Sequence, residues 1–233
     1  SVPNMAIYIL PNKAINLGLV SNNTWEPWPV GIINKANHFC GGAIVSPNAV
    51  VTAASCVMDN DPQGVKIHYN STQREYGYKE VLVKSIFSYS GFTMTTPPKD
   101  DIAVLITQEP MSLNDKTSKK IDLPSQGSCP AVGSMVLVSG WGAQEDNPHL
   151  SNVLKHANFS VKSVDQTNKR FTAGDSGVAL EYGDNGDPGV QNMQLVGVGL
   201  WRWGLYTSSK DPSYFTAVGC YADWIKSIIN KNK

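Results

Sequence analysis

Short apolar segments separated by turn residues fill the sequence, and this pattern limits the fold more than any other feature. The segments are about five residues long, recur at intervals of about 8–15 residues, and have no amphipathic helix between them. Such spacing is typical of antiparallel barrels rather than of a parallel sheet. The first set comprises residues 30–33, 42–45, 49–52, 65–69, 81–87 and 102–107, and the second comprises residues 135–138, 153–161, 177–180 and 194–200. We therefore predict an all-β chain of two antiparallel β-barrels.

A single helix is predicted at the C-terminal end, where apolar residues recur at helical spacing and form one apolar face. These residues are Trp224, Ile225, Ile228 and Ile229. The predicted parts of one domain, residues 1–233, are an extended N-terminal segment at 1–28, a first barrel at about 29–110, a connecting strap at about 111–132, a second barrel at about 133–219 and the helix at about 220–231.

The composition argues against several classes of partner. The chain has 19 basic and 19 acidic side chains, so its formal net charge of zero supplies no field that would gather nucleic acid or an anionic membrane. No apolar run reaches the ~18 residues that a membrane-spanning helix needs. Residues 1–10 lack the basic start and long apolar middle of a signal peptide, so we expect a processed form of a secreted, monomeric protein.

The 4 cysteines fit two disulfides of a secreted protein. They do not fit a zinc site, because no pair has the close Cys-x-x-Cys spacing of zinc ligands, and we expect neither a metal nor a cofactor. Three pairings are open. Three sequons, at Asn22, Asn70 and Asn158, are candidate glycosylation sites. Asn70 is the best of them, because polar loop residues surround it, whereas Asn158 lies inside a predicted strand.

The segment 172–177, Thr-Ala-Gly-Asp-Ser-Gly, is the strongest chemical signal. A serine in such a loop can be a nucleophile, and the backbone N–H groups beside it can bind an oxyanion. Four further motifs accompany it: His38-Phe39-Cys40-Gly41-Gly42 leading to Thr52-Ala53-Ala54-Ser55-Cys56, Asp101-Ile102-Ala103-Val104-Leu105, Ser139-Gly140-Trp141-Gly142, and Tyr221-Ala222-Asp223-Trp224-Ile225-Lys226. In this order they resemble the chymotrypsin/trypsin-like (S1) serine proteases over almost the whole chain.

That resemblance implies two six-stranded barrels with a C-terminal helix and a particular set of site residues. It pairs Cys40 with Cys56 and Cys129 with Cys220. Asp101 matches the orienting aspartate and Ser176 the nucleophile, while the backbone of Gly174 and Ser176 matches the oxyanion hole. Ser55 stands where an active member has its catalytic histidine.

Ser55 cannot act as the general base, because an aliphatic hydroxyl does not titrate near neutral pH as imidazole does. The other histidines are His38, His68, His149 and His156. Only His38 is tied by sequence to the same neighbourhood, and in the family a histidine there has a structural role. We therefore expect a degenerate triad without catalytic activity.

The substrate pocket is expected to be altered as well. Arg170 lies six residues before Ser176, where trypsin-like members place an aspartate, and Trp201-Arg202 puts a long cation where the family has glycine. Only 33 positions separate Trp141 from Gly174, which implies that one pocket wall is shortened. The alternative interpretation is that Arg170 and Arg202 are solvated surface charges.

The activation switch of the family is expected to be absent. Family zymogens are cut before Ile-Val-Gly-Gly, and the matching segment here is Ile15-Asn16-Leu17-Gly18. Without a new α-amino group at Ile15, Asp175 should turn outward or pair with a nearby cation such as Arg170.

Among the known groups, the pattern of losses most resembles the inactivated serine protease paralogues of the scabies mite. That resemblance implies a secreted protein that binds host proteins, including complement components, and interferes with host defence. Two alternatives remain open. One is a residual or unconventional hydrolase that uses Ser176, and the other is a decoy that sequesters protease inhibitors.

Overall fold

The computed structural model describes residues 19–21, 24–35, 39–143, 148–175, 177–205 and 211–233. The strands of the first half are β1 (Leu19–Val20), β2 (Pro29–Ile33), β3 (Phe39–Ser46), β4 (Ala49–Thr52), β5 (Lys66–Tyr69), β6 (Lys79–Ser88) and β7 (Ala103–Thr107). Those of the second half are β8 (Met135–Gly140), β9 (Lys155–Asp165), β10 (Arg170–Ala173), β11 (Pro188–Gln191), β12 (Gln194–Leu200) and β13 (Ser213–Ala217). The helical segments are the 3₁₀ turns η1 (Ala54–Cys56), η2 (Pro62–Gly64) and η3 (Val218–Tyr221), and the helix α1 (Ala222–Lys231).

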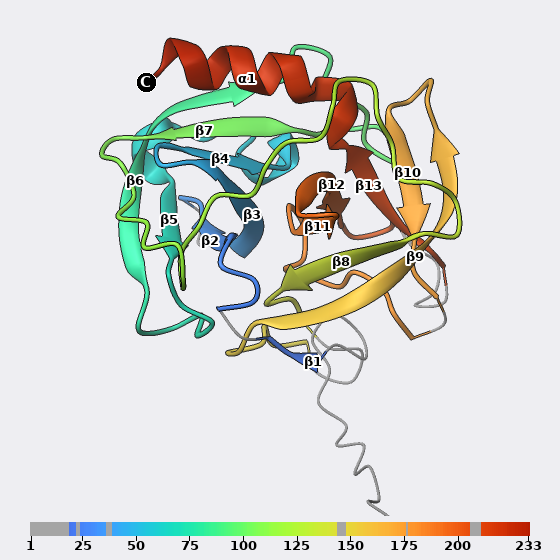
Figure 1. Cartoon of the computed structure of the whole chain (residues 1–233), viewed down its shortest axis with the longest axis horizontal. Coiled ribbons are helices and arrows are strands. Elements are labelled where there is room, and N and C mark those ends of the chain that lie inside the picture. Colours follow the sequence, from blue (N-terminus) through green and yellow to red (C-terminus); the bar gives the residue numbers. More distant parts are fainter. Residues whose placement is uncertain (1–18, 22–23, 36–38, 144–147, 176, 206–210) are drawn as a thin grey trace, which may run out of the picture.

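The first barrel closes in the strand order β2-β3-β4-β7-β6-β5, with every pairing antiparallel. Its central strands are apolar on both faces, and all residues of β4 and β7 are buried. Such strands need cover on both sides, which the barrel interior and α1 provide. Figure 1 shows this barrel on the left, below the red helix.

The second barrel runs β9-β10-β13-β12-β11-β8 and closes through pairing of β8 with β9, while β1 adds a further strand at the outer edge of β9. The predicted pair of six-stranded antiparallel barrels is confirmed. The predicted strand at 177–180 is wrong. The strand lies at 170–173 instead, and glycines with positive φ at 174 (121°) and 177 (88°) bend the chain out of the sheet directly after it.

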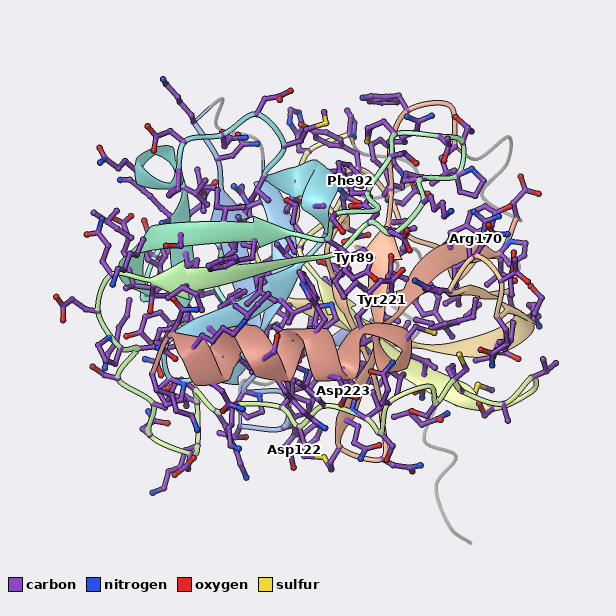
Figure 2. All side chains as sticks on the ribbon, turned by 90° about the horizontal axis from the view of Figure 1, so that it is seen from above. Tyr89, Phe92, Asp122, Arg170, Tyr221 and Asp223 are labelled. Carbon is purple, nitrogen blue, oxygen red and sulfur yellow. A yellow bond between two sulfur atoms is a disulfide. The ribbon has the colours of Figure 1, made fainter. Side chains whose placement is uncertain are left out.

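The predicted C-terminal helix is confirmed as α1, which buries Ala222, Ile225 and Ile228 against the core of the first barrel. Ahead of it, the Tyr221 ring packs edge-on against Tyr89, with 4.9 Å between the ring centroids, as Figure 2 shows where the helix begins. Within the described residues, no helix has the length and apolar character needed to cross a bilayer.

Of the two predicted disulfides, Cys40–Cys56 is formed, and it holds η1 against β3. The predicted Cys129–Cys220 bridge is not formed. Both residues are free thiols, and they interact with each other. Burial, followed by the neighbouring Cys220, raises the pKa of Cys129 to about 11, so this thiol keeps its proton at neutral pH.

Candidate functional site

A cleft of about 220 Å³ opens between the two barrels. The first barrel contributes β3, η1 and the loop before β7, and the second contributes the segment after β12 and the turn at residues 181–187. The lining residues used below are Ser55, Asp101, Tyr182, Asn185, Trp201, Arg202 and Trp203. Two of the predicted triad positions, Ser55 and Asp101, therefore do lie together in a cleft.

Asp101 is held by Ser55 through two hydrogen bonds. The Ser55 backbone N–H donates to Oδ1 over 2.8 Å, and the Ser55 hydroxyl donates to Oδ2 over 2.7 Å. The carboxyl is only 1% exposed, and its burial raises the pKa of Asp101 to about 6 despite these hydrogen bonds. Ser55 thus satisfies the buried aspartate, but its hydroxyl offers no group that titrates near neutral pH.

Asn185, which the sequence analysis missed, completes the cluster. Its Nδ2 donates to the Ser55 hydroxyl oxygen over 2.9 Å and also lies 3.2 Å from the Cys56 sulfur. Its Oδ1 accepts the Trp201 backbone N–H over 3.0 Å, and its carbonyl oxygen accepts the Gly41 N–H over 2.9 Å. A carboxamide is neither a nucleophile nor a base, so the chain Asp101–Ser55–Asn185 joins the two barrels but contains no imidazole base, and its third member is not a serine.

The predicted nucleophile loop does not lie in this cleft. Ser176 itself is outside the described residues, but its neighbours Asp175 and Gly177 are absent from the cleft lining. The Asp175 side chain is 52% exposed and forms an ion pair with Lys162 on β9. Asp175 therefore does pair with a cation, although not with Arg170. Gly174, the described half of the predicted oxyanion hole, does not line the cleft either, and Ser176 lies outside the described residues.

A signal in the sequence could have located Asn185. The pattern Gly-Asp-x-Gly recurs nine residues after the first copy, as Gly183-Asp184-Asn185-Gly186, directly before β11. This second copy lies 42 positions after Trp141 rather than 33, so the predicted shortening of the pocket wall was overestimated by nine residues. In this second copy Asn185 stands at the place of the serine in the pattern, and the intact Gly-Asp-Ser-Gly copy directed the prediction to a loop outside the cleft lining.

The two arginines of the predicted specificity pocket have different places. Arg170 is not in the cleft, because its Nε lies 3.6 Å from Asp165 Oδ2 and its guanidinium lies over the Tyr214 ring, 5.6 Å from the centroid. Figure 2 shows Arg170 on the side of the second barrel, separate from Tyr89, which packs beside the start of α1. Arg202 does line the cleft and donates to the Thr96 hydroxyl, so of the two arginines it alone lies at this wall.

Beside Arg202, three aromatic rings form what we call the aromatic shelf: Tyr182, Trp201 and Trp203. The centroids of Trp201 and Trp203 are 5.0 Å apart, and Tyr182 lies within 6.0 Å of both tryptophans. Trp203 remains 79% exposed. The shelf therefore presents one exposed ring, Trp203, supported by the half-buried rings of Tyr182 and Trp201.

The described histidines do not supply the missing base. His68 stacks on Tyr78 and pairs with Glu80, and His156 pairs with the buried Glu26 through a contact of 2.9 Å. Neither these two nor His149 lines the cleft, and His38 lies outside the described residues.

The remaining predicted positions concern glycans and activation. Asn70 is half-buried, and its Oδ1 accepts the Thr117 hydroxyl. Asn158 lies on β9, yet it is exposed, so the strand does not hide it. Asn22 and the segment Ile15–Gly18 lie outside the described residues. Among the described residues, no group of three or more His, Cys, Asp or Glu side chains could hold a metal ion.

Comparison with known proteins agrees with this geometry. The trypsin family model matches residues 16–225. Trypsin Blo t 3 of Blomia tropicalis is 31% identical over 86% of this chain and 80% of its own length, and trypsin Tyr p 3.0101 of Tyrophagus putrescentiae is 32% identical over 83% and 73%. The crystal structure of the scabies mite inactivated protease paralogue S-D1 matches with a TM-score of 0.86 and 37% identity, over 92% of this chain and 97% of the other. Paralogue S-I1 matches with a TM-score of 0.82 and 35% identity, over 92% and 99%.

Proposed function

The chain belongs to the trypsin family, and from that premise we propose that it is a catalytically inactive member that acts by binding other proteins. The observation that carries this proposal is the hydrogen-bonded chain Asp101–Ser55–Asn185. Family members use a histidine base and a serine nucleophile beside the aspartate. Here both places hold side chains that cannot perform those roles, and the structural relatives are inactivated proteases.

Loss of the base alone would leave little activity. Removing one triad member typically lowers kcat by about 10⁴-fold or more, and the residual rate comes from binding and the oxyanion hole. When the nucleophile is lost as well, acylation has no reacting atom. The alternative of a hydrolase that uses Ser176 is disfavoured, because its neighbour Asp175 is turned to solvent and paired with Lys162.

The binding role is supported by the aromatic shelf at the mouth of the cleft. Exposed aromatic rings supply apolar contact area at low entropic cost and are enriched at protein interfaces. We propose a secreted, monomeric protein whose partners are host proteins of the defence system, with complement components as the first to be tested. A decoy that captures protease inhibitors would use the same cleft and is an alternative outcome of the binding experiment below.

The inactive state is tested with a fluorophosphonate probe and a set of peptide and ester substrates. We expect no labelling of the protein and no cleavage after Lys, Arg, Phe or Leu. Labelling that Ser176→Ala abolishes would overturn the proposal in favour of the hydrolase. An active mite trypsin serves as the positive control for the probe.

The binding role is tested by capture from plasma, followed by affinity measurement with each purified complement component and with protease inhibitors. We expect Trp203→Ala to weaken capture at least about tenfold, as is common for an aromatic anchor. The matched control is Trp25→Ala, because Trp25 is 72% exposed but lies outside the cleft. Equal capture by both variants would contradict the role of the aromatic shelf. Capture of inhibitors alone would contradict the proposed class of partner.

A further inference from the structure

Two completely buried carboxyl groups lie in the turn at 181–187, which connects the β10 side of the second barrel to β11. Asp184 and Asp187 are both 0% exposed. Their carboxyls fit against backbone that has no side chains. A Cβ added to Gly41 or Gly140 would lie 1.8 or 1.7 Å from an Asp187 oxygen, and one on Gly142 would lie 2.2 Å from the Asp184 carboxyl. The glycines of β3 and β8 therefore leave the space that both acids fill.

The two acids differ in their hydrogen bonds. Asp184 accepts the Gly142 N–H over 2.8 Å and the Glu181 N–H over 2.9 Å. Asp187 receives no N–H donor from the described residues, although both of its oxygens are buried. Its polar neighbour is the Asp184 carboxyl, because a single Cβ added to Gly140 would lie 1.7 Å from Asp187 Oδ2 and 2.6 Å from Asp184 Oδ1. Two carboxylates cannot hydrogen-bond to each other, whereas a proton on Asp187 that is donated to Asp184 would satisfy both groups.

The electrostatics agree with this geometry. Burial, followed by the charge of Asp184, raises the pKa of Asp187 well above its ordinary value. Burial also raises the pKa of Asp184 to about 6, against the hydrogen bonds that stabilise its charged form.

The surroundings offer no compensating cation in the described part of the chain. The titratable group that acts on each carboxyl is the other carboxyl. Three strands pack against the two aspartates, and each presents glycine backbone there. These strands are β3 at Gly41, β8 at Gly140 and β12 at Gly199. On the turn itself, Glu181 donates its backbone N–H to Asp184, and the Tyr182 ring lies in the aromatic shelf.

The same turn carries the groups that form the cleft. Asn185 lies between the two acids and bonds both Ser55 and Trp201, and Tyr182 forms one side of the shelf. We propose that the Asp184–Asp187 pair is an acid-dependent latch: one shared proton holds the 181–187 turn in the cleft, and loss of that proton releases the turn and the surface it carries. This inference concerns the fold of the turn and does not rest on the proposed binding role.

The direction of the pH dependence follows from linkage. Both folded-state pKa values are raised, so the stability that the pair contributes is fully present below the unfolded pKa of an aspartate, about 4. It is lost in two steps as the pH rises. Asp184 deprotonates through about 6, which leaves one proton shared by the pair, and Asp187 loses that last proton at a higher pH. The turn should therefore be most stable in acid, opposite to the usual behaviour of an ion-paired aspartate.

The first measurement uses the unmodified protein. Hydrogen exchange of the Gly142 and Glu181 amides, corrected for the intrinsic effect of pH, should lose protection at least about tenfold between pH 5 and pH 8. The infrared carbonyl band of a protonated carboxyl should be present at pH 6 and disappear as protection is lost. Protection that is unchanged or rises with pH, or the absence of that band, would overturn the proposal.

Variants then assign the effect to the pair. Asp187→Asn keeps the size of the side chain and provides an N–H donor without a titrating proton, so its protection should stay flat between pH 5 and pH 8. Asp187→Gly is the second variant in case the amide does not fit. Asp175→Asn is the matched control, because it changes the exposed aspartate of the first Gly-Asp copy and should keep the wild-type profile.

His38 lies outside the described residues, so His38→Gln is included. If that variant alone flattens the profile, a histidine rather than the carboxyl pair controls the turn, and the inference is wrong. If Asp187→Asn and Asp187→Gly both fold but keep the wild-type slope, the inference is wrong as well.

Discussion

Two loops of this protein have the same local pattern, Gly-Asp-x-Gly, and opposite environments. In residues 174–177 the aspartate is 52% exposed and pairs with Lys162, whereas in residues 183–186 the aspartate is fully buried and accepts two backbone N–H groups. The first loop follows β10, and its described residues lie outside the cleft lining, whereas the second precedes β11 and lines the cleft. Both copies lie in the one connection between β10 and β11, so the place of each copy along that connection, and not its own sequence, decides whether it can form a site.

The largest difference is expected when the two aspartates are removed. Asp184→Ala leaves the N–H groups of Gly142 and Glu181 without an acceptor in a buried place, so the free energy of unfolding should fall by about 3 kcal/mol. Asp175→Ala breaks one exposed ion pair and should cost less than about 0.5 kcal/mol. Denaturant unfolding at pH 6 measures both. If both variants lost the same free energy of unfolding, the environments of Asp184 and Asp175 would not differ in the way described above.

A second test concerns how the free energy of unfolding depends on pH through Asp101, which lines the cleft but lies outside the 181–187 turn. Burial raises the pKa of Asp101 to about 6, so the stability that its protonated form contributes is full below about pH 4 and lost as the pH rises through about 6. Asp101→Asn should remove roughly 2 kcal/mol of the stability change between pH 4 and pH 7. The exposed Asp122→Asn is the control. A slope that is unchanged in Asp101→Asn would place the titration elsewhere, with the 181–187 turn as the next candidate.

The contact between the barrels gives a smaller effect. Asn185→Ala removes the hydrogen bonds to Ser55 and to the Trp201 N–H, so thermal unfolding should show a loss of about 1–2 kcal/mol. Asn158→Ala, at an exposed position on β9 outside the cleft, is the matched control. The idea that Asn185 joins the barrels fails if hydrogen exchange in η1 is the same in Asn185→Ala and the native protein.

The smallest effect is expected on catalysis. Ser55→His with Asn185→Ser rebuilds both missing groups, yet we expect at most weak ester acylation and no peptide turnover, because Arg202 still occupies the cleft wall and transition-state stabilisation needs more than the triad. The single variant Ser55→His should show neither ester acylation nor peptide turnover. A burst assay with an activated ester and a peptide substrate separates the steps. Efficient peptide cleavage by the double variant would show that the pocket is intact.

The sequence by itself determined the fold and one half of the site. Strand spacing and the apolar periodicity of α1 are local signals, and the barrels and the helix follow from them because each segment must bury its apolar face. Ser55, Cys56 and Asp101 were placed correctly because Cys40 and Cys56 form a disulfide and the strands β4 and β7 pair directly.

The tertiary structure decided which glycine loop occupies the cleft, what Arg170 contacts, and whether Cys129 and Cys220 are bridged. Two copies of one short pattern cannot be ranked by local sequence, because their difference arises from pairing of β10 with β9 and β13 and of β11 with β12. These pairings join residues far apart in the chain, and they bury Asp184 while they leave Asp175 at the surface. Burial of this kind is a property of the assembled barrel, so the sequence offered two copies and the folded structure chose the one that contains Asn185.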